Sequence, residues 1–262
     1  MHLFPKEKYA LDTHDYIRKV NILKENYNKQ IKVLCGVELG LMPSLKEKIG
    51  DYVSRYDFDF IIGSSHAVNG IDIGYNVDEY FKGKSEKQAY TEYFESILEN
   101  VKTFSCYDVY GHLDYVVRYG PNKNKYFDFN DYKDVFEELL KIIIQNGKGI
   151  EINTGAFRKN LECPHPHKDI LKMYKDLGGQ IITIGSDAHL PEHVGYKFQD
   201  VQELLRSLGF KSYAIFENKV PKFIKLWNVG KKNAQTILIW ANKDIQSFPV
   251  FRNLRGIKLI TP

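Results

Sequence analysis

Short apolar runs alternate with amphipathic segments along the first 226 residues. In residues 86–102 and 132–145, apolar side chains recur every three or four positions, which predicts helices with one buried face. The short runs are almost wholly apolar, as is typical of strands buried on both faces of a parallel sheet. The pattern therefore predicts an α/β fold of repeated βα units, with strands at 32–39, 58–64, 108–113, 149–154, 180–186 and 212–216.

Residues 71–83 interrupt this alternation. They combine glycines, acids and aromatics, and we expect a long loop after the second strand. Long loops that follow strands often contribute to functional sites.

Composition narrows the class of protein. The chain has 262 residues, 43% hydrophobic and 27% charged, which is ordinary for a globular protein. No run approaches the roughly 20 apolar residues of a membrane span, and the first ten residues lack the apolar segment of a secretory signal. The three cysteines lie far apart, so we expect neither disulfides nor a thiolate zinc site. We predict a soluble, cytoplasmic protein.

The net charge of +4 comes from the C-terminal segment. Residues 227–262 hold six basic residues, one acid and both tryptophans of the chain. We therefore place a boundary near Leu226, with a main domain at 1–226 and a basic tail of unknown role at 227–262. The tail alone indicates no specific nucleic-acid binding, since it has no recognisable aromatic and basic pattern.

Polar residues follow several of the predicted strands. Because the carboxyl ends of barrel strands converge on one pocket, we expect them to lie close together: Glu38, His66, His112, Asn153, Asp187 and His189. A single histidine after an apolar run is more often a core or loop residue. Repeated imidazoles and carboxylates, however, favour a site for zinc, manganese or iron, since buried carboxylates without a cation cost several kcal/mol each. Asp114 and Glu151 are equally compatible with structural salt bridges.

Six runs, in order along the chain, resemble motifs of histidinol phosphatases in the polymerase and histidinol phosphatase (PHP) family: GVELG (36–40), FDFIIGSSHAVNG (58–70), GHLDYVVRYGP (111–121), GKGIEINTG (147–155), PHPHKDILKMYKDLGG (164–179) and ITIGSDAH (182–189). The resemblance implies a distorted seven-stranded β/α barrel that holds up to three divalent metals. It also implies hydrolysis of a phosphate monoester, L-histidinol phosphate, in histidine biosynthesis.

The resemblance implies a role for each ligand. Glu38 bridges two metals, His66 and His112 complete one of them, Asp187 binds the other, and His189 binds a third. Such metals neutralise phosphate oxygens and lower the pKa of a water that attacks phosphorus.

Further residues are expected to contact the substrate. Arg118 and Arg158 are candidates to hold the phosphate through paired charge-assisted bonds, and a solvated surface arginine is the alternative for each. Asn153 and His165 complete the expected substrate-binding set. The neighbouring His167 better suits a rigid loop, because prolines interrupt the PHPH run.

The N-terminal sequence departs from the family pattern. The resemblance implies an initial strand with His-x-His, a second strand and a further histidine, whereas the first 20 residues hold only His2 and His14. We expect His14 to be exposed near a helix start. The barrel is thus predicted to lack its first two strands, as in a truncated reading frame, and to hold fewer than three metals on its own.

The tail contains two predicted strands, TILIW (236–240) and GIKLIT (256–261). We expect these strands not to cover the open edge of the barrel, and the tail to stem from a frameshift or readthrough. An uncovered edge favours association between copies. The predicted function is metal-dependent hydrolysis of histidinol phosphate, impaired in this chain. The alternatives are a related phosphoesterase with another small substrate, or a non-catalytic metal-binding remnant.

Overall fold

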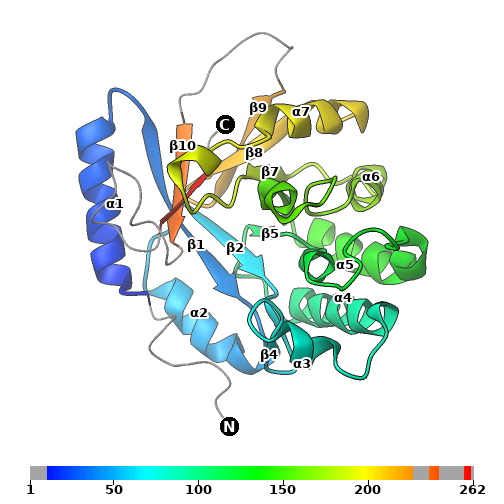
Figure 1. Cartoon of the computed structure of the whole chain (residues 1–262). Coiled ribbons are helices and arrows are strands. Elements are labelled where there is room, and N and C mark those ends of the chain that lie inside the picture. Colours follow the sequence, from blue (N-terminus) through cyan, green and yellow to red (C-terminus); the bar gives the residue numbers. More distant parts are fainter. Residues whose placement is uncertain (1–10, 227–235, 242–256, 261–262) are drawn as a thin grey trace.

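A computed structural model describes residues 11–226, 236–241 and 257–260. Its main sheet curls through the centre of the molecule, with α1 on one side and α4 to α7 on the other (Figure 1). The strands are β1 (Lys32–Gly40), β2 (Phe60–Ser64), β3 (Ala67–Val68), β4 (Ile71–Asp72), β5 (Val109–Tyr110), β6 (Gly149–Asn153), β7 (Ile182–Gly185), β8 (Ser212–Glu217), β9 (Val220–Lys225), β10 (Thr236–Ala241) and β11 (Ile257–Ile260). The helices are α1 (Thr13–Tyr27), α2 (Lys46–Ser54), α3 (Val77–Phe81), α4 (Glu86–Thr103), α5 (Lys133–Gln145), α6 (Lys168–Asp176) and α7 (Phe198–Ser207).

The main sheet has the strand order β11-β10-β1-β2-β5-β6-β7. The strands from β10 to β7 pair in parallel, and the predicted α/β class with a curled parallel sheet is confirmed. Helices α4 and α5 also begin and end within one residue of their predicted bounds. Because parallel strands all end at the same edge, this order places the ends of β1, β2 and β5 next to one another.

Two predicted elements differ from the structure. The strand predicted at 212–216 is β8, which forms an antiparallel hairpin with β9 and does not extend the main sheet. Its turn residues, Asn218 and Lys219, both have positive φ, as a tight two-residue hairpin requires. Residues 71–83 are not wholly a loop, since they contain β4 and α3.

The two strands predicted in the tail are confirmed, but the expectation that they leave the open edge uncovered is wrong. Strand β10 pairs in parallel with β1, from Lys32 opposite Thr236 to Val37 opposite Ala241. Strand β11 then pairs antiparallel with β10. Without β10, the edge of β1 would carry unpaired backbone N–H and C=O groups. The backbone of β10, whose β-branched and apolar residues favour a strand, pairs with these groups. The domain boundary near Leu226 stays a prediction.

The core lies between the sheet and the helices α4 and α5. Helix α4 begins at a capping box, in which Ser85 Oγ accepts from the Gln88 backbone and Gln88 Oε1 accepts from the Ser85 backbone. Phe94 of α4 packs on Phe136 of α5, with ring centroids 4.6 Å apart. Within the described ranges, we find no helix that is long and apolar enough to cross a membrane.

Gly149, at the start of β6, allows a close approach of neighbouring backbone. An alanine Cβ there would collide with the carbonyl oxygen of Ile181. We expect Gly149→Ala to lower the free energy of unfolding by about 1–3 kcal/mol, measured by urea denaturation. Gly50→Ala is the matched control: it lies in α2 with open space around it, and should raise stability by up to about 1 kcal/mol. If Gly149→Ala and Gly50→Ala changed the free energy of unfolding equally, the close packing at Gly149 would be contradicted.

Asp108 gives the fold a pH-dependent contribution. Asp108 directly precedes β5, and its buried carboxylate accepts a hydrogen bond from the Ile61 backbone at 2.8 Å. Burial raises the pKa of Asp108 to about 6. The folded state therefore holds this proton more tightly than the unfolded state does, and stability from this group is lost as pH rises through about 6.

We expect Asp108→Asn to match the parent protein near pH 4 and to exceed its free energy of unfolding by about 1–3 kcal/mol near pH 8. Asparagine can still accept from the Ile61 backbone but carries no charge to bury. Urea denaturation at the two pH values measures the difference. A difference that does not change with pH would show that ionisation of Asp108 has no part in stability.

Candidate metal and phosphate site

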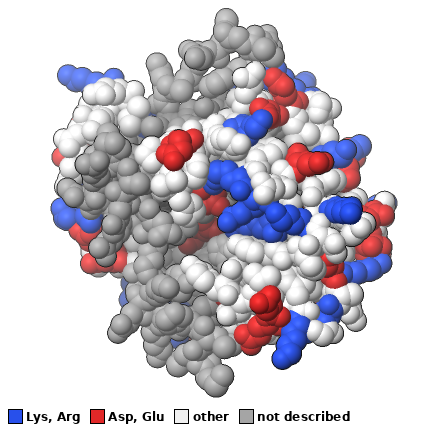
Figure 2. Space-filling model, viewed as in Figure 1, with Lys and Arg blue, Asp and Glu red and all other residues white. Residues whose placement is uncertain are grey.

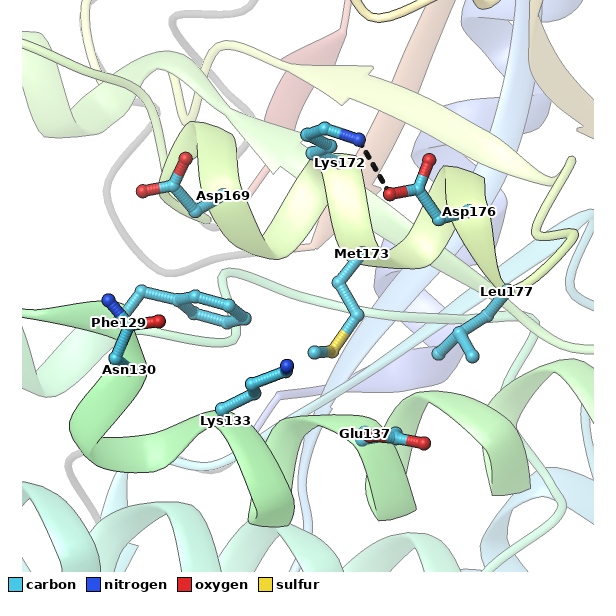
Figure 3. A pocket seen from close by; sticks show the side chains of 9 residues that line it. All are labelled: Phe129, Asn130, Lys133, Glu137, Asp169, Lys172, Met173, Asp176 and Leu177. Atoms are coloured by element: carbon cyan, nitrogen blue, oxygen red, sulfur yellow. Dashed lines mark hydrogen bonds and ion pairs between the residues drawn. The ribbon is translucent and has the colours of Figure 1, made fainter.

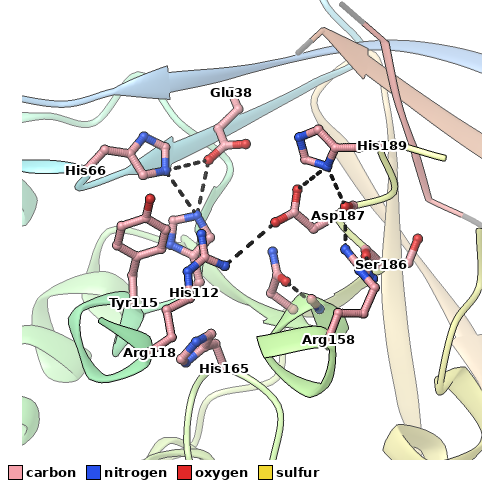
Figure 4. Close-up of polar contacts among 12 residues, drawn as sticks. Glu38, His66, His112, Tyr115, Arg118, Arg158, His165, Ser186, Asp187 and His189 are labelled. Carbon is pink, nitrogen blue, oxygen red and sulfur yellow. Dashed lines mark hydrogen bonds and ion pairs between the residues drawn. The ribbon is translucent and has the colours of Figure 1, made fainter. Parts of the chain in front are cut away.

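Three of the predicted ligands converge at the carboxyl ends of adjacent strands. Glu38 lies near the end of β1, His66 follows β2, and His112 follows β5. Glu38 Oε1 lies 3.2 Å from Nε2 of both histidines, and the two Nε2 atoms are 3.3 Å apart (Figure 4). The structure thus gathers Glu38, His66 and His112 into one triangle of donor atoms, which we call the ligand triangle.

The ligand triangle has the dimensions of a metal site. With bonds of about 2.0–2.1 Å, a tetrahedral zinc ion separates its ligand atoms by about 3.3 Å, close to the spacing of all three pairs. Burial lowers the pKa of His112 to about 4, so its imidazole is neutral near pH 7, the form in which histidine binds metals. Two imidazoles and one carboxylate therefore fit a divalent ion such as zinc.

Tyr115 supports the ligand triangle from one side. Its ring centroid lies 4.9 Å from that of His66 and 4.8 Å from that of His112. Tyr115 is not among the site residues predicted from the sequence. Its position three residues after His112 could have indicated it, because a short 3-10 helix (η2, Tyr115–Arg118) begins there and places the ring beside the histidine.

Asp187 and His189 form a second polar group after β7. His189 Nδ1 lies 2.9 Å from the Asp187 carbonyl oxygen and 3.6 Å from its carboxylate. The backbone at Asp187 has φ +48°, a region that non-glycine residues rarely occupy outside functional sites or tight turns. In Figure 4 this pair faces the same space as the ligand triangle.

Arg118 lies between the two groups. Its side chain is 9% exposed, and its guanidinium lies over the ring of Tyr115 at 4.0 Å and that of Tyr119 at 5.1 Å. One terminal nitrogen is 3.9 Å from an Asp187 carboxylate oxygen (Figure 4). The alternative of a solvated surface arginine is therefore wrong for Arg118, because the aromatic rings enclose it.

Arg158 contacts the backbone that follows β7. It lies in a second 3-10 helix (η4, Thr154–Lys159) and donates to the carbonyl oxygens of Ser186 at 2.7 Å and Asp187 at 2.6 Å. It is half-buried, so the surface alternative is wrong here too. Both terminal nitrogens thus hold the backbone of Asp187 in place through hydrogen bonds. A direct contact of Arg158 with phosphate stays a prediction.

Asn153 and His165 are buried and joined to each other. Their backbones exchange hydrogen bonds of 2.6 and 3.0 Å, and Asn153 Oδ1 accepts from the Gly155 backbone. His165 Nδ1 lies 2.6 Å from Asp114 Oδ1, which gives Asp114 a structural hydrogen-bond partner, and its salt-bridge interpretation stays a prediction. Glu151 is likewise buried, and its carboxylate accepts from Asn153 Nδ2 at 3.3 Å.

The remaining histidines lie outside these groups. His167 caps the start of α6, where its ring accepts from the Asp169 backbone, and its rigid-loop interpretation stays a prediction. His14 is exposed in the first turn of α1, which confirms its predicted position. His2 lies outside the described residues.

An open groove between α5 and α6 is a separate feature of the surface. Its rim carries charged side chains of both signs, and Lys172 pairs with Asp176 at 2.6 Å (Figure 3). None of the side chains that line it belongs to the ligand triangle or to the Asp187 group. The convergent donors therefore mark the candidate site, and this groove does not.

Comparison with known proteins agrees with this geometry. A PHP domain model matches residues 8–155, more than half of the chain. The histidinol-phosphatase of Lactococcus lactis is 31% identical over 213 residues, covering 81% of this chain and 78% of that protein. A probable histidinol-phosphatase of Clostridium acetobutylicum is 31% identical over 218 residues, covering 83% and 82%.

A solved structure extends the similarity to three dimensions. The crystal structure of histidinol phosphate phosphatase from Lactococcus lactis, complexed with zinc, L-histidinol and phosphate, matches with a TM-score of 0.76 and 30% identity. The match covers 84% of this chain and 83% of that one. Sequence and fold thus agree over most of the chain, which belongs to the histidinol phosphatases of the PHP family.

Proposed function

We propose that this protein hydrolyses L-histidinol phosphate to L-histidinol and inorganic phosphate with the help of a divalent metal. The observation that carries the proposal is the ligand triangle, whose three donor atoms lie 3.2–3.3 Å apart at the carboxyl ends of adjacent strands. The related Lactococcus lactis structure contains zinc, L-histidinol and phosphate, which supports both the metal and the substrate. We propose that the protein serves histidine biosynthesis and acts in the cytoplasm.

Glu38, His66 and His112 would hold the metal in this reaction. A divalent ion bound there supplies positive charge to phosphate oxygens and lowers the pKa of water. The carboxylate of Glu38 and the neutral ring of His112 stay directed at one point because both lie at strand ends of the rigid sheet. In the hydrolysis, water would add to phosphorus, the bond from phosphorus to the substrate oxygen would break, and the proton given up by the water would pass to that oxygen, which leaves as the alcohol.

Arg118 would bind the phosphate. The rings of Tyr115 and Tyr119 hold its guanidinium in place, and its 3.9 Å separation from Asp187 is longer than a hydrogen bond. The planar group can therefore present donors to phosphate oxygens without first giving up a tight ion pair. In the space-filling view, basic side chains gather near the centre of the face shown, an arrangement suited to a small anion (Figure 2).

Asp187 would share a second metal with Glu38, and His189 would contribute to a third metal position, both near the phosphate. Asp187 and His189 face the same space as the ligand triangle (Figure 4). Among the described residues a group of three converging donors is found at the ligand triangle and not here, so these positions should bind metal more weakly. Titration of metal-free protein with zinc, followed by calorimetry, separates a tight first equivalent from a weaker second one.

The substrate is tested by phosphate release from a panel of phosphate monoesters, with zinc or manganese added. We expect the highest kcat/KM for L-histidinol phosphate. A higher kcat/KM for another ester would replace the proposed substrate. Metal binding without turnover of any ester would indicate a non-catalytic remnant.

A further inference from the structure

The Asp114 carboxylate is a buried group that the proposed reaction does not use. Asp114 is 2% exposed, and each of its oxygens has a partner. Oδ1 accepts from the ring of His165 at 2.6 Å, and Oδ2 accepts from the backbone of His167 at 2.8 Å. Asp114 follows the ligand His112 by two residues and precedes η2, which carries Arg118. It therefore ties the loop after β5 to the loop that precedes α6.

From His165 the connection continues to the end of β6. The backbones of His165 and Asn153 pair as an isolated antiparallel bridge. The Asn153 side chain then accepts from the Gly155 backbone at 2.8 Å and so caps η4. Three loops of the site are thus joined by hydrogen bonds between buried groups, which resist distortion because breaking one leaves a buried polar atom without a partner.

The last part of this connection reaches Asp187. Arg158, in η4, donates to the carbonyl oxygens of both Ser186 and Asp187. The packing is also close, since a Cβ at Gly155 would lie 2.8 Å from Asn153 Oδ1 and 3.1 Å from Asp187 Cβ. A shift of η4 would therefore move Asp187, whose backbone already has a positive φ.

We propose that Asp114 is a positioning residue that sets the placement of the Asp187 group relative to the ligand triangle, through His165, Asn153 and Arg158. The inference rests on the proposed function, because it assigns a task to Asp114 within the same reaction. Asp114 does not touch the substrate in this account. It acts by keeping the loops after β5, β6 and β7 in one arrangement.

A double-mutant cycle tests this connection. Asp114→Asn keeps one acceptor oxygen of two, and Arg158→Lys keeps the charge but loses the planar pair of nitrogens that bond the two carbonyl oxygens. Each substitution should lower kcat by about 10–100-fold. If both act on the placement of Asp187, the double variant should be little slower than the slower single variant. If the two losses multiply, the connection does not exist and the proposal is wrong.

Asp59→Asn is the matched control for a merely structural loss. Asp59 is also buried, precedes β2 at the opposite end of the sheet, and accepts from the Cys35 backbone at 2.7 Å and from Lys24 at 3.0 Å. It should lower the free energy of unfolding, leave kcat within about twofold, and combine additively with Arg158→Lys. If Asp59→Asn and Arg158→Lys showed the same coupling in kcat as Asp114→Asn and Arg158→Lys, the proposal would be overturned.

A second readout separates this inference from the proposed function. The affinity of the zinc-loaded protein for inorganic phosphate, measured by calorimetry, needs no turnover. Absence of turnover in the parent protein would overturn the proposed function. The double-mutant cycle, measured as phosphate affinity in place of kcat, would still decide whether Asp114 and Arg158 are coupled. If Asp114→Asn does not fold, Asn153→Ala replaces it in the cycle, because it removes the cap on η4 further along the connection.

Discussion

Glu38→Gln is expected to abolish tight zinc binding and to lower the turnover of histidinol phosphate by more than about 100-fold, beyond the usual effect of a residue that only supports a ligand. The amide is a weak metal ligand, and without the carboxylate the ligand triangle keeps only two imidazoles. Metal analysis of the purified variant and a phosphate-release assay measure the two effects.

The matched control for this prediction is Glu47→Gln. Glu47 lies exposed in the first turn of α2, and its substitution removes the same charge from the same type of side chain. We expect zinc content and kcat equal to those of the parent protein. Full zinc content in Glu38→Gln would show that the metal binds elsewhere in the chain.

Arg118→Lys is expected to lower kcat by about 100–1000-fold, as for the loss of a preorganised donor to the transition state. Lysine keeps the positive charge but loses the planar pair of donors and the stack on Tyr115. Because Arg118 does not belong to the ligand triangle, zinc content should not change. Steady-state kinetics and metal analysis of the same sample give both values.

Arg55→Lys provides the corresponding surface control. Arg55 is exposed, with only a 3.9 Å pair to Asp51, and its substitution should leave kcat and KM unchanged. An Arg118→Lys variant with the kcat of the parent protein would exclude Arg118 from the phosphate site.

The ligand triangle could be predicted from sequence because it depends on a simple geometric rule. Glu38, His66 and His112 each lie near the end of an apolar run, and adjacent parallel strands end at one edge. Their residue types then indicate a metal. This inference needs neither exact strand bounds nor side-chain conformations.

The backbone contacts of Arg158 could not be predicted in this way. Its residue type suggests phosphate binding, whereas its position beneath the Ser186 and Asp187 carbonyl groups depends on how η4 packs on the loop after β7. The same limit applies to the burial of Arg118, which two tyrosines of its own segment enclose. Such contacts are decided by packing, which the spacing of residue types does not specify.

The pairing of β10 with β1 was missed for a different reason. The apolar runs of the tail predict strands, but a strand can pair with any exposed edge. Which edge is available depends on the order of all other strands, and that order is a property of the assembled sheet. The hairpin of β8 and β9 likewise depends on a local turn, which lets β8 pair with β9 and not with a strand of the main sheet.

We expect a metal held by Glu38, His66 and His112 to drive the hydrolysis of histidinol phosphate. The most direct test is to strip the protein with a chelator, add zinc stepwise, and follow metal binding and phosphate release in the same titration. We predict no turnover without metal and a rise in turnover that follows occupancy of a tight site absent from Glu38→Gln. Undiminished turnover by the stripped protein, or full recovery in Glu38→Gln, would contradict the account.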